Sequence, residues 1–349
     1  MKMSRKTKNI LLSIFILLLL IGGISFYYIQ SQFLSPLNSK LANDTYLYID
    51  NDDTIDSVQI KINQAFGLSK FPAGFAKLSE LKDYKHRIRT GKYKVTADDT
   101  AYALFNRLSR GHQTPSKLVI NNIRTIDQLT GRLGRQLMLD SLELKLFFNT
   151  DLELEKRGFT KETLPALFIP NTYEVYWNMD MLEFMERMQK EYKRFWNDER
   201  LKKAEAIGLT PIEVATLASI VEEETNSAGE KATVAGLYMN RLHRGMPLQA
   251  DPTVKFALQN FTIKRILNEY LKYDSPYNTY LYAGLPPGPI RLASIPGLES
   301  VLNYEKHNYI YMSAKEDFSG KHNFATNFED HKANARKYRK ELDKLKIYK

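Results

Sequence analysis

The sequence predicts an α+β protein with a single N-terminal transmembrane helix, and three observations support this fold class. Residues 10–29 carry no charge and are long enough, as a helix, to cross a bilayer. Residues 44–122 alternate short strand-like and helix-like segments, which is typical of a small α+β module. Residues 123–349 combine longer amphipathic helices with a C-terminal hairpin. We therefore expect an anchor, a small module and a larger mixed α+β domain, in this order.

The N-terminal segment favours a retained membrane anchor. Residues 1–9 form a short basic head, which the positive-inside rule places in the cytoplasm. Its basic residues are Lys2, Arg5, Lys6 and Lys8. The alternative is a cleaved signal peptide, but its apolar region would span only about 7–15 residues. A polar linker at 30–43 then leads to the small module, so we expect nearly all of the chain outside the cytoplasm.

Composition excludes several kinds of chemistry. The 349 residues include no cysteine, which excludes disulfides, thiolate metal sites and cysteine nucleophiles. The net charge is +10, from 50 basic and 40 acidic residues. Such a balance suits nucleic acid, anionic lipid or an acidic polymer. Because the location is extracytoplasmic, we expect no nucleic acid partner, and a solvated basic surface remains the default explanation.

The periodicity of apolar residues predicts the individual elements. In the small module we expect strands at 46–49, 91–95 and 116–120, and helices at 54–66 and 100–110. In the larger domain we expect helical segments at 125–149, 181–195 and 230–244, an interruption at 168–173, a hairpin of 309–314 with 321–326, and a basic helix at 327–346.

The most informative helix is predicted to begin at Thr210 and to run to about Thr225. Thr210, Pro211 and Glu213 form a capping box with proline at the first helical position. The apolar stripe of this helix consists of Val214, Leu217, Ile220 and Val221. Three consecutive glutamates end it, although negative charge is unfavourable at a helix C-terminus. Three such charges suggest a function, and exposed structural acids are the alternative.

The three glutamates fan out around the helix axis by about 100° per residue. Glu223 lies opposite the stripe and is expected to face solvent. Glu222 shares its column with Ala215 and Ala218, and this shallow column would let a ligand approach. Glu224 lies on the other flank and should be more enclosed. A partly desolvated carboxyl has a raised pKa, as a general acid requires.

The loops after this helix suit sugar binding. Gln249 precedes a short helix for which we predict Asp251 as N-cap. Residues 275–280 and 284–289 are rich in proline, tyrosine and asparagine, and such rigid aromatic loops can stack on sugar rings. An ordinary structural turn is the alternative. His322 shares a strand face with Phe324, although a lone histidine is more often structural than catalytic.

Taken in order, these segments resemble the endolytic murein transglycosylase family, the YceG-like proteins. The matching stretches are 168–173, 218–225, 240–242, 245–254, 277–280, 284–290 and 322–324, and the core motifs span 210–326. The family usually has aspartate where this chain has Asn171. The segment from Gly91 to Ile120 is similar, more weakly, to the LysM-like subdomain of that family.

The resemblance implies a membrane-anchored enzyme that cleaves peptidoglycan glycan strands between N-acetylmuramic acid and N-acetylglucosamine. It implies 1,6-anhydro ends, with Glu222 as the catalytic acid and no metal or cofactor. The implied cleft residues are Glu224, Asn240, Gln249, Asp251, Tyr277, Asn278 and Tyr280, with Glu224 and Tyr277 foremost. The implied partners are glycan strands, the cell membrane through residues 10–29, and peptidoglycan synthases.

Two other classes stay open. A hydrolytic muramidase would use water as the nucleophile, with Asp251 or Glu224 as a second carboxylate. A non-catalytic scaffold protein would bind the wall without cleaving it. The presence of Glu222 with its flanking motifs argues against an inactive homologue.

Overall fold

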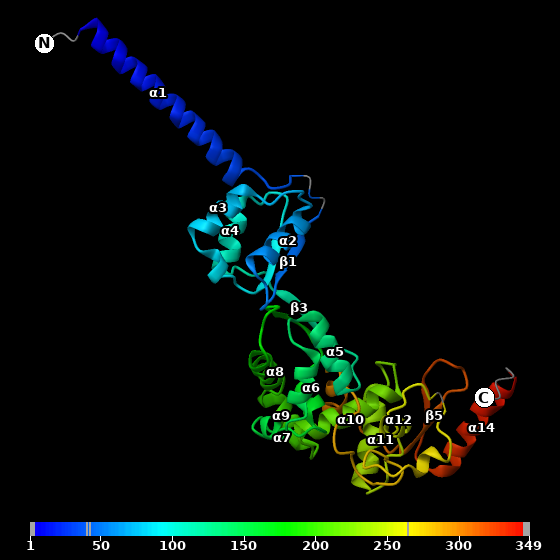
Figure 1. Ribbon diagram of the computed structural model, residues 1–349. Helices are drawn as coiled ribbons and strands as arrows, with labels where there is room; N and C mark the ends of the chain where they lie inside the picture. Colours follow the sequence, from blue (N-terminus) through cyan, green and yellow to red (C-terminus); the bar gives the residue numbers. More distant parts are fainter. Residues whose placement is uncertain (1–3, 40, 42, 264, 345–349) are drawn as a thin grey trace. The chain divides into compact units, whose positions relative to one another are not determined.

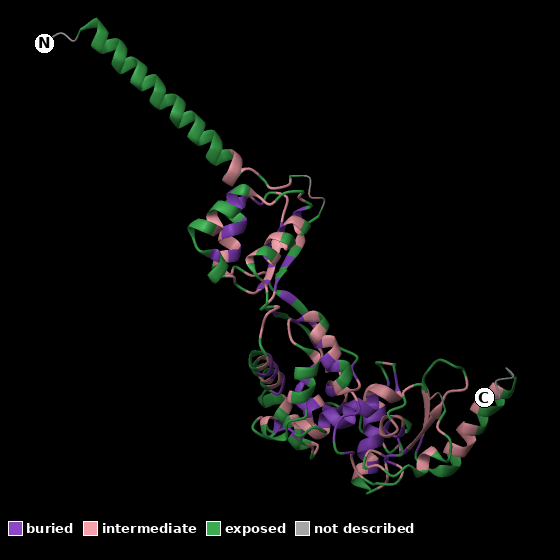
Figure 2. Cartoon of the chain, viewed as in Figure 1, coloured by how far each residue is buried: buried purple, intermediate pink, exposed green. Residues whose placement is uncertain are grey.

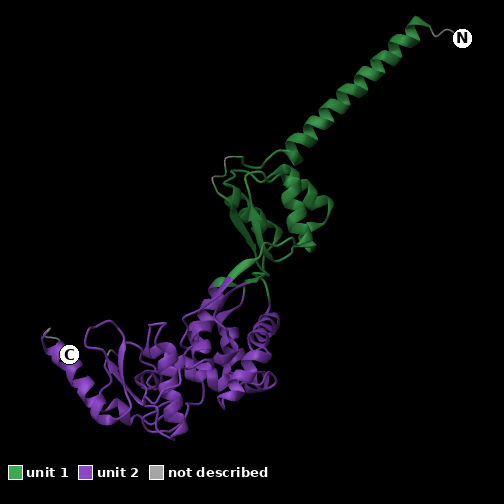
Figure 3. Cartoon of the chain, turned by 180° about the vertical axis from the view of Figure 1, so that it is seen from behind, with its two compact units in different colours: residues 1–117, 136–138, 174–179 green, residues 118–135, 139–173, 180–349 purple. Residues whose placement is uncertain are grey.

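The computed structural model describes residues 4–39, 41, 43–263 and 265–344. The chain is a mixed α+β protein that divides into two compact units (Figures 1 and 3). Unit 1 comprises residues 1–117, 136–138 and 174–179, and unit 2 comprises 118–135, 139–173 and 180–349. Strands β3 (Ser116–Ile120) and β4 (Asn171–Val175) pair with each other and contain residues at which the chain passes from one unit to the other.

The N-terminal helix α1 (Arg5–Ile29) is long and apolar enough to span a membrane. Its side chains are exposed along its whole length (Figure 2), as expected for a helix with no protein partner on any face. The hydroxyl of Ser4 caps the helix by accepting from the amide of Thr7 at 3.2 Å. The helix therefore includes the predicted segment 10–29 and begins five residues earlier, because a helix can extend through polar residues beyond an apolar stretch.

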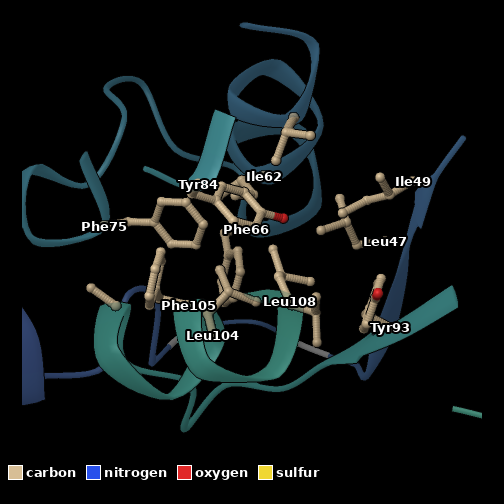
Figure 4. Packing of buried hydrophobic residues seen from close by; sticks show 13 residues of the cluster. Leu47, Ile49, Ile62, Phe66, Phe75, Tyr84, Tyr93, Leu104, Phe105 and Leu108 are labelled. Carbon is tan, nitrogen blue, oxygen red and sulfur yellow. The ribbon is translucent and has the colours of Figure 1, made fainter. Parts of the chain in front are cut away.

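The rest of unit 1 is the small α+β module. Its elements are β1 (Thr45–Ile49), α2 (Ile55–Phe66), α3 (Ala73–Leu81), β2 (Gly91–Val95) and α4 (Ala101–Arg110). The predicted strands and helices are confirmed to within one residue, and α3 was not predicted. β1 and β2 pair in antiparallel register, with Leu47 opposite Tyr93. Their inward side chains and the helices enclose one apolar cluster, in which Phe75, Tyr84 and Phe105 make edge-on ring contacts (Figure 4).

Unit 2 is mostly helical. Its helices are α5 (Ile126–Gln136), α6 (Ser141–Phe148), α7 (Asp151–Glu155), α8 (Met181–Phe195), α9 (Asp198–Ala206), α10 (Pro211–Glu224), α11 (Lys231–His243), α12 (Asp251–Ala257), α13 (Ile295–Leu302) and α14 (Phe328–Lys344). The hairpin pairs β5 (Tyr311–Ala314) with β6 (His322–Ala325), which confirms the predicted hairpin. The last two residues of the predicted terminal helix lie outside the described residues.

The helix α10 lies at the centre of unit 2 and packs against α11, α12 and α13 (Figure 2). The predicted capping box is confirmed, since the Thr210 hydroxyl accepts from the amide of Glu213 and the Glu213 side chain accepts from the amide of Thr210. All residues from Val214 to Val221 are buried, so the helix is covered on every side and not along one stripe.

Two predicted boundaries were wrong. The helical segment 125–149 is broken, because Asp140 accepts from the amides of Leu142 and Glu143 and starts the new helix α6. The helix α12 has Ala250 as its N-cap, and Asp251 is its first helical residue. The Asp251 carboxylate is thereby a side chain of the first helical turn and not the cap.

Candidate active site

Glu222 lies against the N-terminus of α13 and not on an open face. Its Oε2 accepts from the backbone amide of Ser294 at 2.8 Å, and its Oε1 accepts from the Ser294 hydroxyl. Lys231 Nζ lies 3.2 Å from Oε1, and Arg291 Nε lies 4.0 Å from Oε2. Only 10% of the Glu222 side chain is exposed. The carboxylate is therefore a buried anion surrounded by donors and cations.

The environment of Glu222 favours its charged form. Burial opposes ionisation, but the two hydrogen bonds from Ser294 and the charges of Lys231 and Arg291 outweigh it, so the pKa of Glu222 is below its ordinary value. The shallow column expected beneath Glu222 is absent, because Ala215 and Ala218 are buried. A helical wheel shows which residues of one helix share a column, but not which other helix packs against that column. In the fold, α13 packs against α10.

Glu223 was expected to face solvent, and this expectation was wrong. Arg124 donates to both of its carboxylate oxygens, from Nε and Nη2, at 2.9 Å each. Arg291 Nη1 also donates to Oε1 at 2.8 Å. The bidentate geometry is the strong form of an arginine–carboxylate pair. Glu223 therefore connects the end of α10 to segments distant in the sequence, and the two arginines offset part of the unfavourable negative charge at the helix terminus.

Glu224 lines a cavity of about 240 Å³, whereas Glu223 lines a smaller one of about 60 Å³. Tyr238 on α11 donates to Glu224 Oε1 at 2.8 Å. Burial raises the pKa of Glu224 to about 7, and the charge of Asp251 adds to this effect against the opposing hydrogen bond from Tyr238. A carboxyl with this pKa can hold a proton near neutral pH and deliver it to a ligand.

Four of the predicted site residues meet at this cavity. Its lining residues are Glu224, Leu237, Tyr238, Arg241, Leu248, Gln249, Asp251, Tyr280, Met312, Ser313, Ala314 and His322. Tyr280 donates its phenol proton to Asp251 Oδ1 at 2.6 Å. The residues predicted at 249, 251 and 280 are thus placed beside Glu224 by the loops that follow α11 and precede α13. Carboxyl, phenol and amide groups converge there, as in a site that binds polar ligands.

Gln249 has a backbone conformation that its loop imposes. Its φ is +52°, which is unusual for a residue other than glycine, asparagine or aspartate. Its amide donates to the Thr279 carbonyl at 3.0 Å, and the next amide, of Ala250, donates to the Thr279 hydroxyl at 3.0 Å. The two loops that supply Gln249 and Tyr280 are therefore joined, and the strain at Gln249 is maintained beside the cavity.

Asn240 and Asn278 do not line this cavity. The Asn240 amide donates to the carbonyls of His307 and Tyr309, at 2.7 and 3.0 Å. The Asn278 amide donates to the carbonyls of Leu271 and Tyr273, at 3.0 and 2.8 Å. Both side chains bind loop backbone, and their role toward a ligand stays a prediction.

Tyr277 lines a different cavity of about 240 Å³ in unit 2. Its ring packs against Phe256 with centroids 4.7 Å apart, and Arg124 and Glu162 also line this space. Burial raises the pKa of the Tyr277 phenol. Tyr277 and Tyr280 are thus directed to separate cavities although they are only three positions apart.

The sequence argument did not include Tyr238, Arg241 or His322 among the cleft residues. Arg241 is buried and donates to the carbonyls of Ile310 and Leu248, at 2.7 Å each. A tyrosine and an arginine within an apolar helix stripe indicate a buried polar site, because such groups require hydrogen-bond partners when buried. The sequence cannot say which loop or strand provides those partners.

An α+β domain with a partly buried carboxyl of raised pKa at a polar cavity is typical of an acid–base enzyme. The model of the YceG-like family matches residues 47–337. The chain belongs to the YceG-like family. An endolytic murein transglycosylase of Bacillus subtilis is 27% identical over 92% of this chain and 91% of that protein.

Two further relatives extend the comparison. An endolytic murein transglycosylase of Streptococcus pneumoniae is 25% identical over 92% of this chain, which spans 63% of that longer protein. The crystal structure of a yceG-like protein from Listeria monocytogenes superposes with a TM-score of 0.55 at 23% identity, over 83% of this chain and 99% of that one. The structural match extends the similarity to the fold.

Proposed function

We propose that this protein is a membrane-anchored endolytic lytic transglycosylase of peptidoglycan. It cleaves the bond between N-acetylmuramic acid and N-acetylglucosamine within nascent glycan strands, leaves 1,6-anhydro ends and so terminates strand growth. The relatives named endolytic murein transglycosylases support the reaction class. The single structural observation that carries the proposal is Glu224, a carboxyl with a pKa of about 7 at a polar cavity.

We assign the general acid to Glu224 in place of Glu222. A general acid needs a proton at working pH and access to the substrate. The pKa of Glu222 is lowered, and Ser294 and Lys231 bind its oxygens, which favours a charged, hydrogen-bonded carboxylate. Glu224 has a pKa raised to about 7 and lines the polar cavity, which supports it as the acid. Tyr238 donates to Oε1 of Glu224, so Oε2 is the oxygen that carries the proton.

The proposed reaction needs one carboxyl. Protonated Glu224 donates to the glycosidic oxygen, the bond from that oxygen to the anomeric carbon breaks, and the N-acetylglucosamine leaves with a free hydroxyl. The substrate's own N-acetyl group stabilises the positive charge at the anomeric carbon. Glu224 then accepts the proton of the muramic 6-hydroxyl, whose oxygen bonds to the anomeric carbon. No water is consumed, and Glu224 ends protonated as it began.

The products distinguish this proposal from its nearest alternative. Digestion of purified peptidoglycan by the chain in detergent, followed by mass analysis, should give ends 18 Da lighter than a reducing end, the mass of the water not added. A hydrolytic muramidase would give reducing ends. One observation favours that alternative, since Asp251 lines the same cavity as Glu224 and could act as a second carboxylate. Reducing ends as the main product would overturn the transglycosylase assignment.

The pH dependence of cleavage should follow Glu224. Because the active form is protonated, kcat/KM should fall as pH rises through about 7 and then decrease roughly tenfold per pH unit. The measurement is cleavage rate at low substrate concentration between pH 5 and 9. Glu222→Gln should leave this alkaline limb in place. A rate that rises steadily from pH 6 to 9 would contradict a protonated carboxyl as the catalytic acid.

We further propose that α1 holds the cavity near the membrane, with residues 1–9 cytoplasmic and the remainder outside the cytoplasm. The apolar α1 and the basic residues before it support this location. The small module, expected at 44–122, is proposed as LysM-like, and the larger domain at 123–349 as catalytic. Peptidoglycan synthases are the proposed membrane partners, because they produce the strands to be cut, and co-purification from membranes tests this association.

A further inference from the structure

His322 is a histidine at the Glu224 cavity that the proposed reaction does not use. It lies on β6 and lines the cavity together with Glu224 and Asp251. Only 14% of its side chain is exposed. A buried histidine at the wall of a polar cavity can bind a ligand directly, provided that its ring is held in one orientation.

Glu230 binds the backbone of His322 and lies beside one edge of its ring. This buried glutamate accepts from the backbone amide of His322 at 2.8 Å, and its Oε2 lies 3.5 Å from His322 Nδ1. The Thr225 hydroxyl also donates to Glu230 Oε2, at 3.3 Å. Thr225 directly follows Glu224, so Glu230 joins the end of α10 to β6. His322 Nδ1 makes no hydrogen bond to the described residues, but its edge of the ring is the one that lies beside Glu230, which leaves Nε2 as the nitrogen that can reach the cavity.

The charges of the cavity restrict the group that Nε2 can bind. Glu224 and Asp251 both line the cavity, and an anionic ligand group would be repelled by Asp251. A neutral acceptor oxygen has no such penalty. In the substrate proposed above, the acetamido carbonyl is the strongest neutral acceptor, and each sugar unit of an N-acetylated strand carries one. The Gln249 side chain in the same cavity can serve the same group.

We propose that His322 is a substrate-binding residue that donates from Nε2 to the acetamido carbonyl of a sugar in the Glu224 cavity, and that Glu230 is its positioning residue. This inference rests on the proposed function, because it takes the ligand to be an N-acetylated glycan. It assigns sugar recognition to the C-terminal hairpin, whereas the proton transfer is assigned to α10.

The test measures binding and not cleavage. The full chain with Glu224→Gln, in detergent, is titrated with two neutral β-1,4-linked tetrasaccharides, one of N-acetylglucosamine and one of glucose, which differ at the acetamido group. We expect tighter binding of the acetylated tetramer, about tenfold. Adding His322→Ala should remove this preference, whereas His322→Gln, which keeps an N–H donor, should retain part of it. His243→Ala, at an exposed histidine of α11, is the matched control and should change nothing.

Several results would overturn the inference. The inference fails if the Glu224→Gln chain prefers the acetylated tetramer equally with and without His322→Ala. It also fails if the Glu224→Gln chain binds both tetramers with the same affinity. Glu230→Gln should weaken binding of the acetylated tetramer by a smaller factor, and an unchanged affinity would remove Glu230 from the argument. If the wild-type chain produces anhydro ends while His322→Ala leaves binding unchanged, only this inference fails. If the wild-type chain cleaves no peptidoglycan, the proposed function fails as well.

Discussion

Glu224→Gln should reduce peptidoglycan cleavage by about 10²- to 10⁴-fold, the usual contribution of a general acid. Glutamine keeps the shape of the side chain and can still accept from the Tyr238 hydroxyl, but it has no acidic proton to donate. The fold should therefore persist while the reaction is lost. Release of anhydro-ended fragments, measured by mass spectrometry, gives the rate, and circular dichroism checks folding.

Glu222→Gln is the matched comparison, because it makes the same chemical change two residues earlier. The wild-type carboxylate accepts two hydrogen bonds from Ser294 and forms an ion pair with Lys231. The side-chain amide of glutamine would place an N–H group against these donors. We expect a loss of about 1–3 kcal/mol in the free energy of unfolding and cleavage within about tenfold of wild type. Abolished cleavage in Glu222→Gln together with an active Glu224→Gln would restore Glu222 as the acid.

The largest expected effect on stability comes from Arg241→Met. Arg241 donates to the carbonyls of Ile310, Leu248 and Pro247, and methionine would leave these acceptors without that partner. We expect a loss of about 3 kcal/mol in the free energy of unfolding, since each unsatisfied buried polar group costs about 1–3 kcal/mol. Chemical denaturation of the chain in detergent measures it.

Two further variants test whether the geometry of Arg241 matters or only its charge. Arg241→Lys keeps the charge but lacks the planar set of donors, so it should recover only part of the stability. Arg244→Met alters an exposed arginine at the end of the same helix and should be nearly neutral. Equal effects of Arg241→Met and Arg244→Met would show that the backbone contacts of Arg241 do not hold the cavity wall together.

Local sequence patterns determined much of this protein. The apolar run predicted α1, and the capping box at Thr210 predicted where α10 begins. Alternating residues predicted β2 and β3 at their observed bounds. These features depend on interactions between residues a few positions apart, so they can be predicted from the sequence without knowledge of the tertiary structure. The loops that line the cavity with Gln249, Asp251 and Tyr280 were also marked by composition and by family resemblance.

The different surroundings of the three glutamates are visible only in the tertiary structure. They are consecutive and identical, and a helical wheel gives each a direction but not a neighbour. Ser294, just before α13, binds the Glu222 carboxylate, Arg124 and Arg291 bind Glu223, and Tyr238 binds Glu224 at a cavity. Most of these partners are distant in the sequence. A carboxyl's pKa depends on burial and on nearby charges, and both are set by packing between distant segments.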